Sequence, residues 1–420
     1  MRKALFIAAF AAALWLAPGA LASGWCGGSV ESSADRPDVV TGAQVHAVVA
    51  TPADAPDQFA ATAGRLADDV GSLSLWWTGQ DPTRVPRYDM ATFPGGTCLD
   101  ISFVHLPQPA SAYQGESAFG TLANALGASG LGGLYKDYVV YYDGPAVEDG
   151  LCGTGAGDFD QGNGLAVVWL NGCTDVPSDS VQTHELLHAF GALPPGAPNA
   201  CTPATDPFGE IDTGHPCDSP SDVLYPVTDG RPLQQQVLDY NHDDYYGHSG
   251  TQNDIQDAIF LHHLNTPEEA LGLSISGTGH VASDLPGVDC TTACTTQWDQ
   301  GTKVSLAPIP SSKTHFIRWA GGCVGSAGCM LDLSNPTAVT AVFGPAAIPV
   351  TVSTTGKGRV ACTPNCSKKF SAGARLTLRA IPAKGWKFAR WAGACAGTRP
   401  TCTPKTDYAV SARANFKQKR

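Results

Sequence analysis

The stretch THELLHAFG, residues 183–191, decides how the first half of this chain folds and what it carries. It places His184 and His188 four residues apart, and residues at that spacing lie on one face of an α-helix. Two imidazoles on one helix face can bind a single zinc ion. Glu185 lies next to them, where its carboxylate can take a proton from a zinc-bound water. The stretch therefore predicts a helix with a hydrolytic zinc site.

The flanking residues agree with a strand, a turn and a helix in this order. The apolar run from 164 to 170 is typical of a buried strand, and residues 171–177 of a turn. Ser178 is suited to cap the helix N-terminus. Gly191, followed by Pro and Gly at 194–196, predicts the helix end.

The first residues have the pattern of a secretory signal peptide. Two basic residues precede an apolar run from Ala4 to Leu16, and a small-x-small site ends at Ala22. We expect cleavage near Ala22 and export to the extracellular or periplasmic space. No later stretch reaches the about 20 apolar residues that a membrane-spanning helix needs.

Fourteen cysteines in an exported chain favour disulfides over thiol chemistry. Six precede residue 270 and eight follow it, so each half can pair completely. A rival role for Cys26 is a thiolate that blocks the zinc in a latent form. Among the fifteen connectivities that six cysteines permit, local spacing favours Cys152 with Cys173 and Cys201 with Cys217, which leaves Cys26 with Cys98.

The net charge of −12 conceals an asymmetry along the chain. Residues 346–420 carry 15 Lys and Arg against one acidic residue, Asp407, so their charge is +14 and the preceding residues carry −26. This predicts an acidic body with a basic module that can contact an anionic cell surface or polysaccharide. The alternative is a solvated basic face without a partner. We expect no specific nucleic-acid partner, no transmembrane segment and a monomer.

The chain repeats itself after Ser274. Four residues of the first unit recur 72 positions later and two recur 73 positions later; the pairs are Cys290/Cys362, Cys294/Cys366, Trp319/Trp391, Cys323/Cys395, Cys329/Cys402 and Phe343/Phe416. Alternating apolar residues and glycine turns predict two small all-β modules with disulfides, 274–345 and 346–420. We expect each tryptophan to be core rather than a ligand platform.

Both units resemble the cysteine-containing bacterial surface repeats related to internalin-type B-repeats. They share segments of the type Leu-x-Ala-x-Pro, Phe-x-x-Trp-x-Gly-x-Cys and Val-x-Ala-x-Phe within residues 306–343 and 378–416. The resemblance implies modules that serve as stalks or adhesion domains.

Residues 23–268 are predicted to form one α/β (α+β) unit with a mixed sheet and an active-site helix. The strands are expected at 44–50, 99–104, 138–142 and 165–170, and further helices at 56–77 and 118–126. The strand at 165–170 is expected to be the sheet edge that binds an extended substrate. Trp76, Trp77 and Trp169 are expected to pack in the core or at its rim, and 266–273 is expected to be a hinge.

A catalytic zinc usually keeps three protein ligands and one water. In the pattern His-Glu-x-x-His-x-x-Gly-x-x-His the third histidine falls at position 194, which is Pro194 here. We favour His215, within the segment GHPCD at 214–218. The alternatives are Asp218, Asp206, Asn199 and Glu210, with Glu268 and Glu269 as a less favoured pair at the start of a short helix.

Gly191, His215 and the segment DVLY at 222–225 together resemble secreted bacterial metzincin proteases with an expanded loop before the third ligand. The resemblance spans roughly residues 160–262 and implies a zincin-like catalytic domain. It places Leu224 at the position of the methionine under the metal, a mild change in volume. It also implies one of two roles for Tyr225: its hydroxyl donates a hydrogen bond to the oxyanion, or its ring has a packing role only. Snapalysin-like relatives use an aspartate as the third zinc ligand, so Asp218 and Asp206 remain alternatives for that position.

The predicted function is that of a secreted zinc endopeptidase that cleaves protein or peptide substrates, with Glu185 as general base. One alternative is a secreted adhesion protein with a structural or vestigial zinc site. Another is a zinc hydrolase that acts on cell-wall peptides. Acidic loops at 158–162 and 239–246 have oxygen ligands that suit Ca²⁺, but neither fits an EF-hand, and solvated loops or helix caps explain them better.

Overall fold

The computed structural model describes residues 25–26, 34–157, 159, 162–193, 195–209, 214–227, 229–366, 369–371 and 373–419. The expected signal peptide, Pro194 and Glu210 lie outside these residues. The chain divides into two compact units, one built mainly from Val45–Asn265 and the other mainly from Thr266–Arg420. Over the described residues the structure is mostly β with few helices, and none of those helices is long and apolar enough to cross a membrane.

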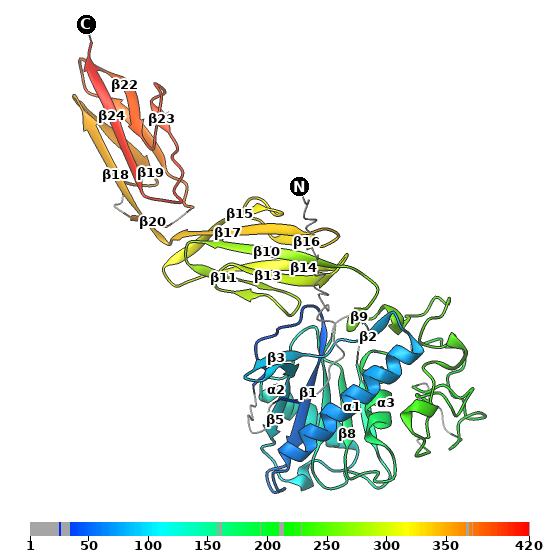
Figure 1. Ribbon diagram of the computed structural model, residues 1–420. Helices are drawn as coiled ribbons and strands as arrows, with labels where there is room; N and C mark the ends of the chain where they lie inside the picture. The colour runs from blue at the N-terminus through cyan, green and yellow to red at the C-terminus, as the bar shows by residue number, and fades with distance from the viewer. Residues whose placement is uncertain are drawn as a thin grey trace, which may run out of the picture. The chain divides into compact units, whose positions relative to one another are not determined.

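A five-stranded sheet forms the centre of the first unit (Figure 1). Its strand order is β5 (Ile101–His105), β1 (Gln44–Thr51), β6 (Lys136–Tyr142), β8 (Leu165–Trp169) and β7 (Gly153–Ala156). β1 is parallel to β5 and β6 is parallel to β8, whereas β7 runs antiparallel to β8. Parallel strands in such a sheet are covered on both faces, and every residue of β1, β6 and β8 is buried.

The edge of this sheet differs from the prediction. β8 lies between β6 and β7, so the expectation that residues 165–170 form the edge strand was wrong. The edge strand is β7, whose four residues Gly-Thr-Gly-Ala have none of the β-branched alternation that identifies a strand in a sequence.

Three α-helices accompany the sheet: α1 (Phe59–Gln80), α2 (Ala118–Ala128) and α3 (Ser178–Ala189). Leu122 of α2 joins Val48, Val140 and Val167 in one core cluster, so α2 covers one face of the sheet. α1 and α3 contact each other. Trp77 of α1 is fully buried, as predicted.

Short strands complete the first unit. β4 (Gly96–Leu99) pairs with β3 (Met90–Phe93), so the single strand expected at 99–104 is split between β4 and β5. β2 (Arg84–Pro86) pairs with β9 (Leu261–His263).

Each repeat of the second unit contains two small sheets (Figure 1). In the first repeat they have the orders β13-β10-β17-β15 and β12-β11-β14-β16, with β10 (Glu268–Ser276), β11 (Gly279–Ser283), β12 (Asp289–Cys290), β13 (Cys294–Asp299), β14 (Lys303–Pro310), β15 (Thr314–Gly321), β16 (Cys329–Asp332) and β17 (Thr337–Pro345).

The second repeat has the orders β20-β18-β24-β22 and β19-β21-β23, with β18 (Ala347–Thr355), β19 (Gly358–Thr363), β20 (Lys369–Ser371), β21 (Thr377–Pro382), β22 (Trp386–Gly393), β23 (Thr401–Cys402) and β24 (Val410–Gln418). Glu268 and Glu269 open β10, so the short helix predicted there was wrong and the hinge expected at 266–273 is mostly strand.

Seven disulfides pair all fourteen cysteines. The first unit has Cys26–Cys98, Cys152–Cys173 and Cys201–Cys217, which confirms the pairing that local spacing favoured. The pairing of Cys26 excludes a free thiolate at that position in this structure. Each repeat has two disulfides: Cys290–Cys294 and Cys323–Cys329 in the first, and Cys362–Cys366 and Cys395–Cys402 in the second.

The repeated tryptophans form the cores of their modules. Trp319 and Trp391 are 1% and 2% exposed. Their rings contact those of Phe316 and Phe388, with centroids 4.9 and 5.5 Å apart. The prediction that they are core residues is confirmed.

Replacing Trp391 by Ala should lower the free energy of unfolding of the second repeat by about 3–5 kcal/mol, because a large buried ring leaves a cavity. Urea unfolding followed by limited proteolysis of the repeat measures this change. Lys384→Ala, at an exposed turn position, should change the same value by less than about 0.5 kcal/mol. Equal midpoints for the two variants would contradict the assignment of Trp391 to the core.

Candidate metal centre

Helix α3 holds the two motif histidines and Glu185 in the interior of the first unit. The helix begins at Ser178 itself rather than after it, and Pro177 takes the N-cap position. The Ser178 hydroxyl instead contacts the carboxylate of Asp69 and accepts a hydrogen bond from Arg65 Nε at 2.8 Å. The N-cap prediction for Ser178 was therefore wrong by one residue.

The C-terminus of α3 is a Schellman motif. The N–H of Gly191 donates to the carbonyl of His188, and the N–H of Ala192 donates to the carbonyl of Leu187. Gly191 has φ +79°, in the left-handed region that a residue with a Cβ rarely adopts. The predicted sharp turn at Gly191 is therefore present, and it starts the chain on its return toward the histidines.

Three imidazole nitrogens converge at one point. The Nε2 atom of His215 lies 3.1 Å from that of His184 and 3.2 Å from that of His188, and the latter two are 3.2 Å apart. Tetrahedral zinc ligands with Zn–N bonds of about 2.0–2.1 Å lie about 3.3 Å from one another. The three nitrogens therefore fit a zinc ion bound by three histidines, and they bring together the residues that the sequence favoured.

The Val223 carbonyl fixes the orientation of the His184 ring. Its Nδ1 lies 2.7 Å from the carbonyl oxygen of Val223, so Nδ1 carries the proton and donates. Such a second hydrogen bond fixes the tautomer of a ligating histidine. Burial, together with the neighbouring His184 and His215, holds the pKa of His188 well below its usual range, which favours the neutral ring that can bind a cation.

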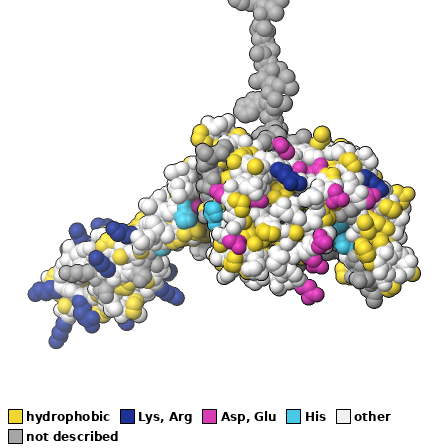
Figure 2. All heavy atoms as spheres, turned by 90° about the horizontal axis from the view of Figure 1, so that it is seen from below, with side chains coloured by type: hydrophobic (Ala, Val, Ile, Leu, Met, Phe, Trp, Pro, Cys, Tyr) yellow, Lys and Arg dark blue, Asp and Glu magenta, His cyan; other side chains and the backbone are white. Residues whose placement is uncertain are grey.

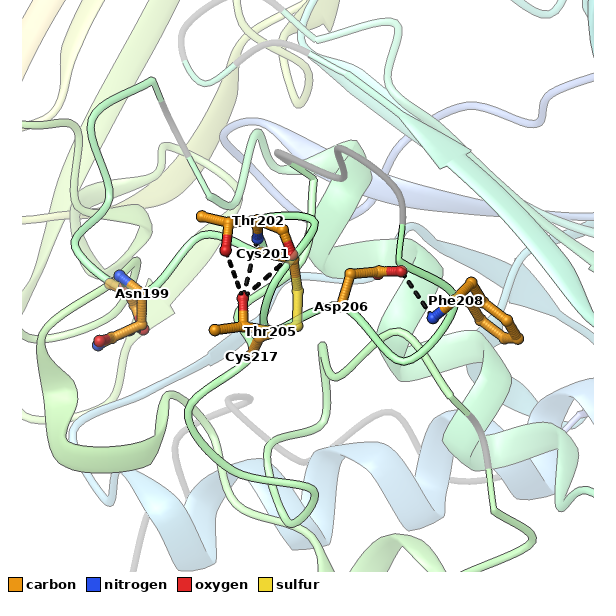
Figure 3. Close-up of a disulfide and its surroundings, with 8 residues drawn as sticks. Asn199, Cys201, Thr202, Thr205, Asp206, Phe208 and Cys217 are labelled. Atoms are coloured by element: carbon orange, nitrogen blue, oxygen red, sulfur yellow. Dashed lines mark hydrogen bonds between the residues drawn. A yellow bond between two sulfur atoms is a disulfide. The ribbon is translucent and has the colours of Figure 1, made fainter.

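A stapled loop returns His215 to the helix. The disulfide Cys201–Cys217 closes this loop (Figure 3), the N–H of Cys201 donates to the His215 carbonyl at 2.9 Å, and the N–H of Cys217 donates to the Asn199 carbonyl at 2.9 Å. An antiparallel bridge between Ala200 and Pro216 lies between these bonds. The backbone on both sides of His215 is thus fixed.

The alternative third ligands lie elsewhere. Asp206 lies beside the Cys201–Cys217 disulfide, where its carboxylate accepts the N–H of Phe208 at 2.8 Å (Figure 3). Asp218 groups with Asp243 and Asp244 rather than with the histidines. Asn199 binds the Asp244 carboxylate through its backbone N–H and side-chain amide. Glu210 lies outside the described residues.

A tight turn at residues 222–225 supports the three histidines through a hydrogen bond to His184. The N–H of Tyr225 donates to the Asp222 carbonyl at 3.1 Å, and Val223 in this turn supplies the carbonyl that binds His184. Leu224 is fully buried. Tyr225 is half-buried and lines a small pocket that also contains Ser180 and Arg231, so its role as an oxyanion donor stays a prediction.

Two buried carboxylates hold this turn. Asp222 accepts the N–H of Leu224 and of Tyr240 at 2.7 Å each, and the hydroxyl of Tyr245 at 2.8 Å. Asp239 accepts the N–H of Tyr245 and of Tyr246 at 2.8 and 2.6 Å. The Asp239 oxygens of the acidic loop at 239–246 therefore cap backbone donors, which is the second of the two interpretations that its sequence left open. In the loop at 158–162, Asp158, Asp160 and Gln161 lie outside the described residues.

Glu185 lies between α3 and the edge strand. It is 7% exposed, and burial raises the pKa of its carboxyl to about 8. A Cβ added to Gly153 of β7 would lie 2.4 Å from Glu185 Oε1, so only glycine permits this approach. Gly155 meets the backbone of Glu185 equally closely. Neither glycine was predicted as part of the site, although their Gly-x-Gly spacing signals a close backbone contact.

The repeats match a known family model. Residues 287–347 and 348–420 each match the divergent InlB B-repeat domain. The C-terminal part of this chain consists of two divergent InlB B-repeats. This confirms the resemblance seen in the sequence of the repeats, and each B-repeat keeps its two disulfides and its buried tryptophan.

Comparisons with whole proteins give weaker likenesses. Wild-type OgpA from Akkermansia muciniphila is 12% identical over 91% of this chain and 99% of its own, with a TM-score of 0.28. A catalytically inactive OgpA in complex with an O-glycopeptide, glycodrosocin, has the same identity and coverage and a TM-score of 0.29. The major pilin T-13 from Streptococcus pyogenes is 9% identical over 37% of this chain and 98% of its own, with a TM-score of 0.13. No curated protein matches the chain.

His215→Ala should reduce zinc binding strongly, whereas Asp218→Ala should leave it unchanged, because His215 faces the other two nitrogens and Asp218 does not. Metal content after dialysis, and competition with a chromogenic chelator, measure the difference. Changes to residues that only hydrogen-bond a metal ligand cost about 10–100-fold in metal affinity, so loss of a direct ligand should cost more. A larger loss in the Asp218 variant would assign the third ligand to the aspartate.

Proposed function

We propose that this chain is an exported zinc-dependent endopeptidase with a metzincin-like catalytic domain in its first unit. The observation that carries the proposal is the set of three Nε2 atoms within 3.2 Å of one another, beside a buried carboxylate on the same helix. Three histidines with a neighbouring glutamate are the ligand and base set of hydrolytic zinc sites. His184, His188 and His215 would hold the metal.

Zinc, when bound, would lower the pKa of a coordinated water to about 7 and polarise the carbonyl of the scissile peptide. Glu185 would take the proton from the attacking water and pass it to the leaving amine. A bound cation would also favour the ionised form of the carboxyl, opposing the burial that raises its pKa. Val223 would keep His184 in the ligating tautomer throughout.

Strand β7 is the best candidate for the substrate platform. It is the outermost strand of the sheet on the side of α3, and its glycines touch Glu185. An extended peptide that adds to a sheet edge gains main-chain hydrogen bonds along its length. On β7, such a peptide would pass beside the carboxylate that acts on it. This replaces β8 in the substrate-binding role that the sequence suggested.

The remaining parts of the chain suit a protein that works outside the cell. Disulfides persist in oxidising compartments, and seven are present here. The two B-repeats would then be accessory modules. A secreted adhesion protein with a structural zinc site would share all of these features except turnover, so a chelator-sensitive protease assay on the full chain separates the two functions.

Glu185→Gln should keep zinc bound and lower kcat by about 10²–10⁴-fold, because the amide cannot accept the water proton. Cleavage of a fluorescent casein substrate and the metal content of the same sample provide the two readouts. The exposed carboxylate Glu148 gives a matched control, since Glu148→Gln should retain native activity. Full activity of the Glu185 variant would remove this residue from the mechanism.

Gly153→Ala should lower kcat by about tenfold or more without loss of zinc, because the new methyl group displaces the Glu185 carboxylate. Gly127→Ala, at an exposed position of α2 where an added Cβ meets no atom within 4 Å, is the matched control and should behave as the native chain. Activity and metal content of both variants test the contact. Native kcat in the Gly153 variant would show that the strand and the base are further apart during catalysis.

A further inference from the structure

The second B-repeat has a sheet face that is basic and open to solvent. Dark blue Lys and Arg side chains gather on this module in Figure 2. Strand β24 alternates strictly, with Val410, Ala412, Ala414 and Phe416 buried and Arg413 and Lys417 exposed. Its neighbours β18 and β22 lie on either side, so the exposed residues of the three strands form one continuous surface.

The strand register places the charges side by side. Lys387 of β22 lies directly opposite Lys417 of β24, and Arg390 lies opposite Asn415. Arg413 stands between Ala392 of β22 and Ser353 of β18. We call this surface the basic face and define it by Lys387, Arg390, Arg413 and Lys417, all of which are exposed.

The first B-repeat has the same architecture without these charges. His315 and Gly344 oppose each other in β15 and β17, as Lys387 and Lys417 do in β22 and β24. The first repeat has Thr340 at the position of Arg413. Of the four basic-face positions, only that of Arg390 is also basic in the first repeat, where it is Arg318. The B-repeat scaffold therefore does not require the basic face.

The second B-repeat cannot neutralise this face by itself. Residues 346–420 contain a single acidic side chain, Asp407, against 15 Lys and Arg. Like charges directly opposite each other on neighbouring strands oppose folding. Their side chains are about 5 Å apart at Cβ, well inside the Debye length of about 8 Å at physiological ionic strength. An external polyanion would relieve this repulsion.

We propose that the basic face binds an anionic polysaccharide. Exposed hydroxyl groups line the face between its charges: Thr351, Ser353 and Thr355 of β18, and Ser411 of β24. The half-buried amide of Asn415 accepts a hydrogen bond from the Thr355 hydroxyl at 2.6 Å. A charged glycan presents the matching alternation of carboxylate or sulfate groups and hydroxyls. The proposal is independent of any catalytic activity in the first unit.

Other polyanions fit this face less well. Single-stranded nucleic acids are bound by stacking on aromatic side chains, and stable membrane binding takes an inserted apolar group or lipid anchor in addition to a basic patch. Among the described residues of this repeat, the exposed large hydrophobic residue is Tyr408, which lies outside the three strands. A flat sheet face also has no element that enters a groove of duplex DNA.

The test compares two triple variants of the full chain with the same change in net charge. Lys387→Thr, Arg413→Thr and Lys417→Thr remove charges from the basic face. Arg359→Thr, Arg379→Thr and Lys384→Thr remove exposed charges elsewhere on the same repeat. The probes are immobilised dextran sulfate and polygalacturonate, with neutral dextran, a DNA duplex and phosphatidylserine vesicles as comparators.

The native chain should bind both charged glycans at low salt and release them at about 1 M salt, where the Debye length falls to about 3 Å. The basic-face variant should bind at least about tenfold more weakly, and the control variant less than about threefold. Binding to dextran sulfate alone would specify a sulfated glycan, and binding to polygalacturonate alone a carboxylated one.

Several outcomes would overturn the proposal. These are no binding at low salt, equal losses in the two variants, or tighter binding to DNA or vesicles than to the charged glycans. If circular dichroism shows that the basic-face variant does not fold, a variant that adds charges to the first B-repeat tests the proposal instead. His315→Lys with Thr340→Arg gives the first B-repeat two of the charges, and it should tighten glycan binding by about threefold or more. Unchanged binding of that folded variant would refute the proposal.

Discussion

The convergence of three imidazole nitrogens on one point is the constraint on which the first unit depends. Nitrogen lone pairs 3.2 Å apart repel unless a cation lies between them, so the surrounding structure has to hold each ring in place. Two rings are fixed by four-residue spacing on α3. The third arrives through a loop, and the Schellman turn at Gly191, the Cys201–Cys217 disulfide and the backbone bonds around His215 determine its position.

The hydrogen bonds of the turn at 222–225 explain why an acidic segment lies close to the candidate metal centre without joining its three histidines. The carboxylate oxygens of Asp222 and Asp239 accept hydrogen bonds from backbone N–H groups and from a buried tyrosine hydroxyl. These bonds hold the turn that presents the Val223 carbonyl to His184. Carboxylates that accept several backbone hydrogen bonds act as caps. In this segment, side-chain capping takes the place of the hydrogen bonds of a helix or sheet.

Local sequence was sufficient for some parts of this molecule and not for others. Helix α3, its glycine end and the disulfides Cys152–Cys173 and Cys201–Cys217 follow from spacing, because each depends on residues close in the chain. The favoured third ligand came from a resemblance, and the structure brings it to the other two. Sheet order has no such local signal: β7 is four small residues, and only its pairing with β8 makes it the edge. The N-cap prediction for Ser178 was wrong because its hydroxyl contacts the carboxylate of Asp69, 109 residues away in the chain.

The two B-repeats separate what a scaffold requires from what its surface can vary. Inward positions of β17 and β24 carry apolar residues in both modules, and each packs around a tryptophan and two disulfides. Outward positions are small and mostly neutral in the first module but basic in the second. Because side chains on a strand alternate between faces, the outer face can change its charge without altering the core. A duplicated module thus acquires a new surface while its fold stays the same.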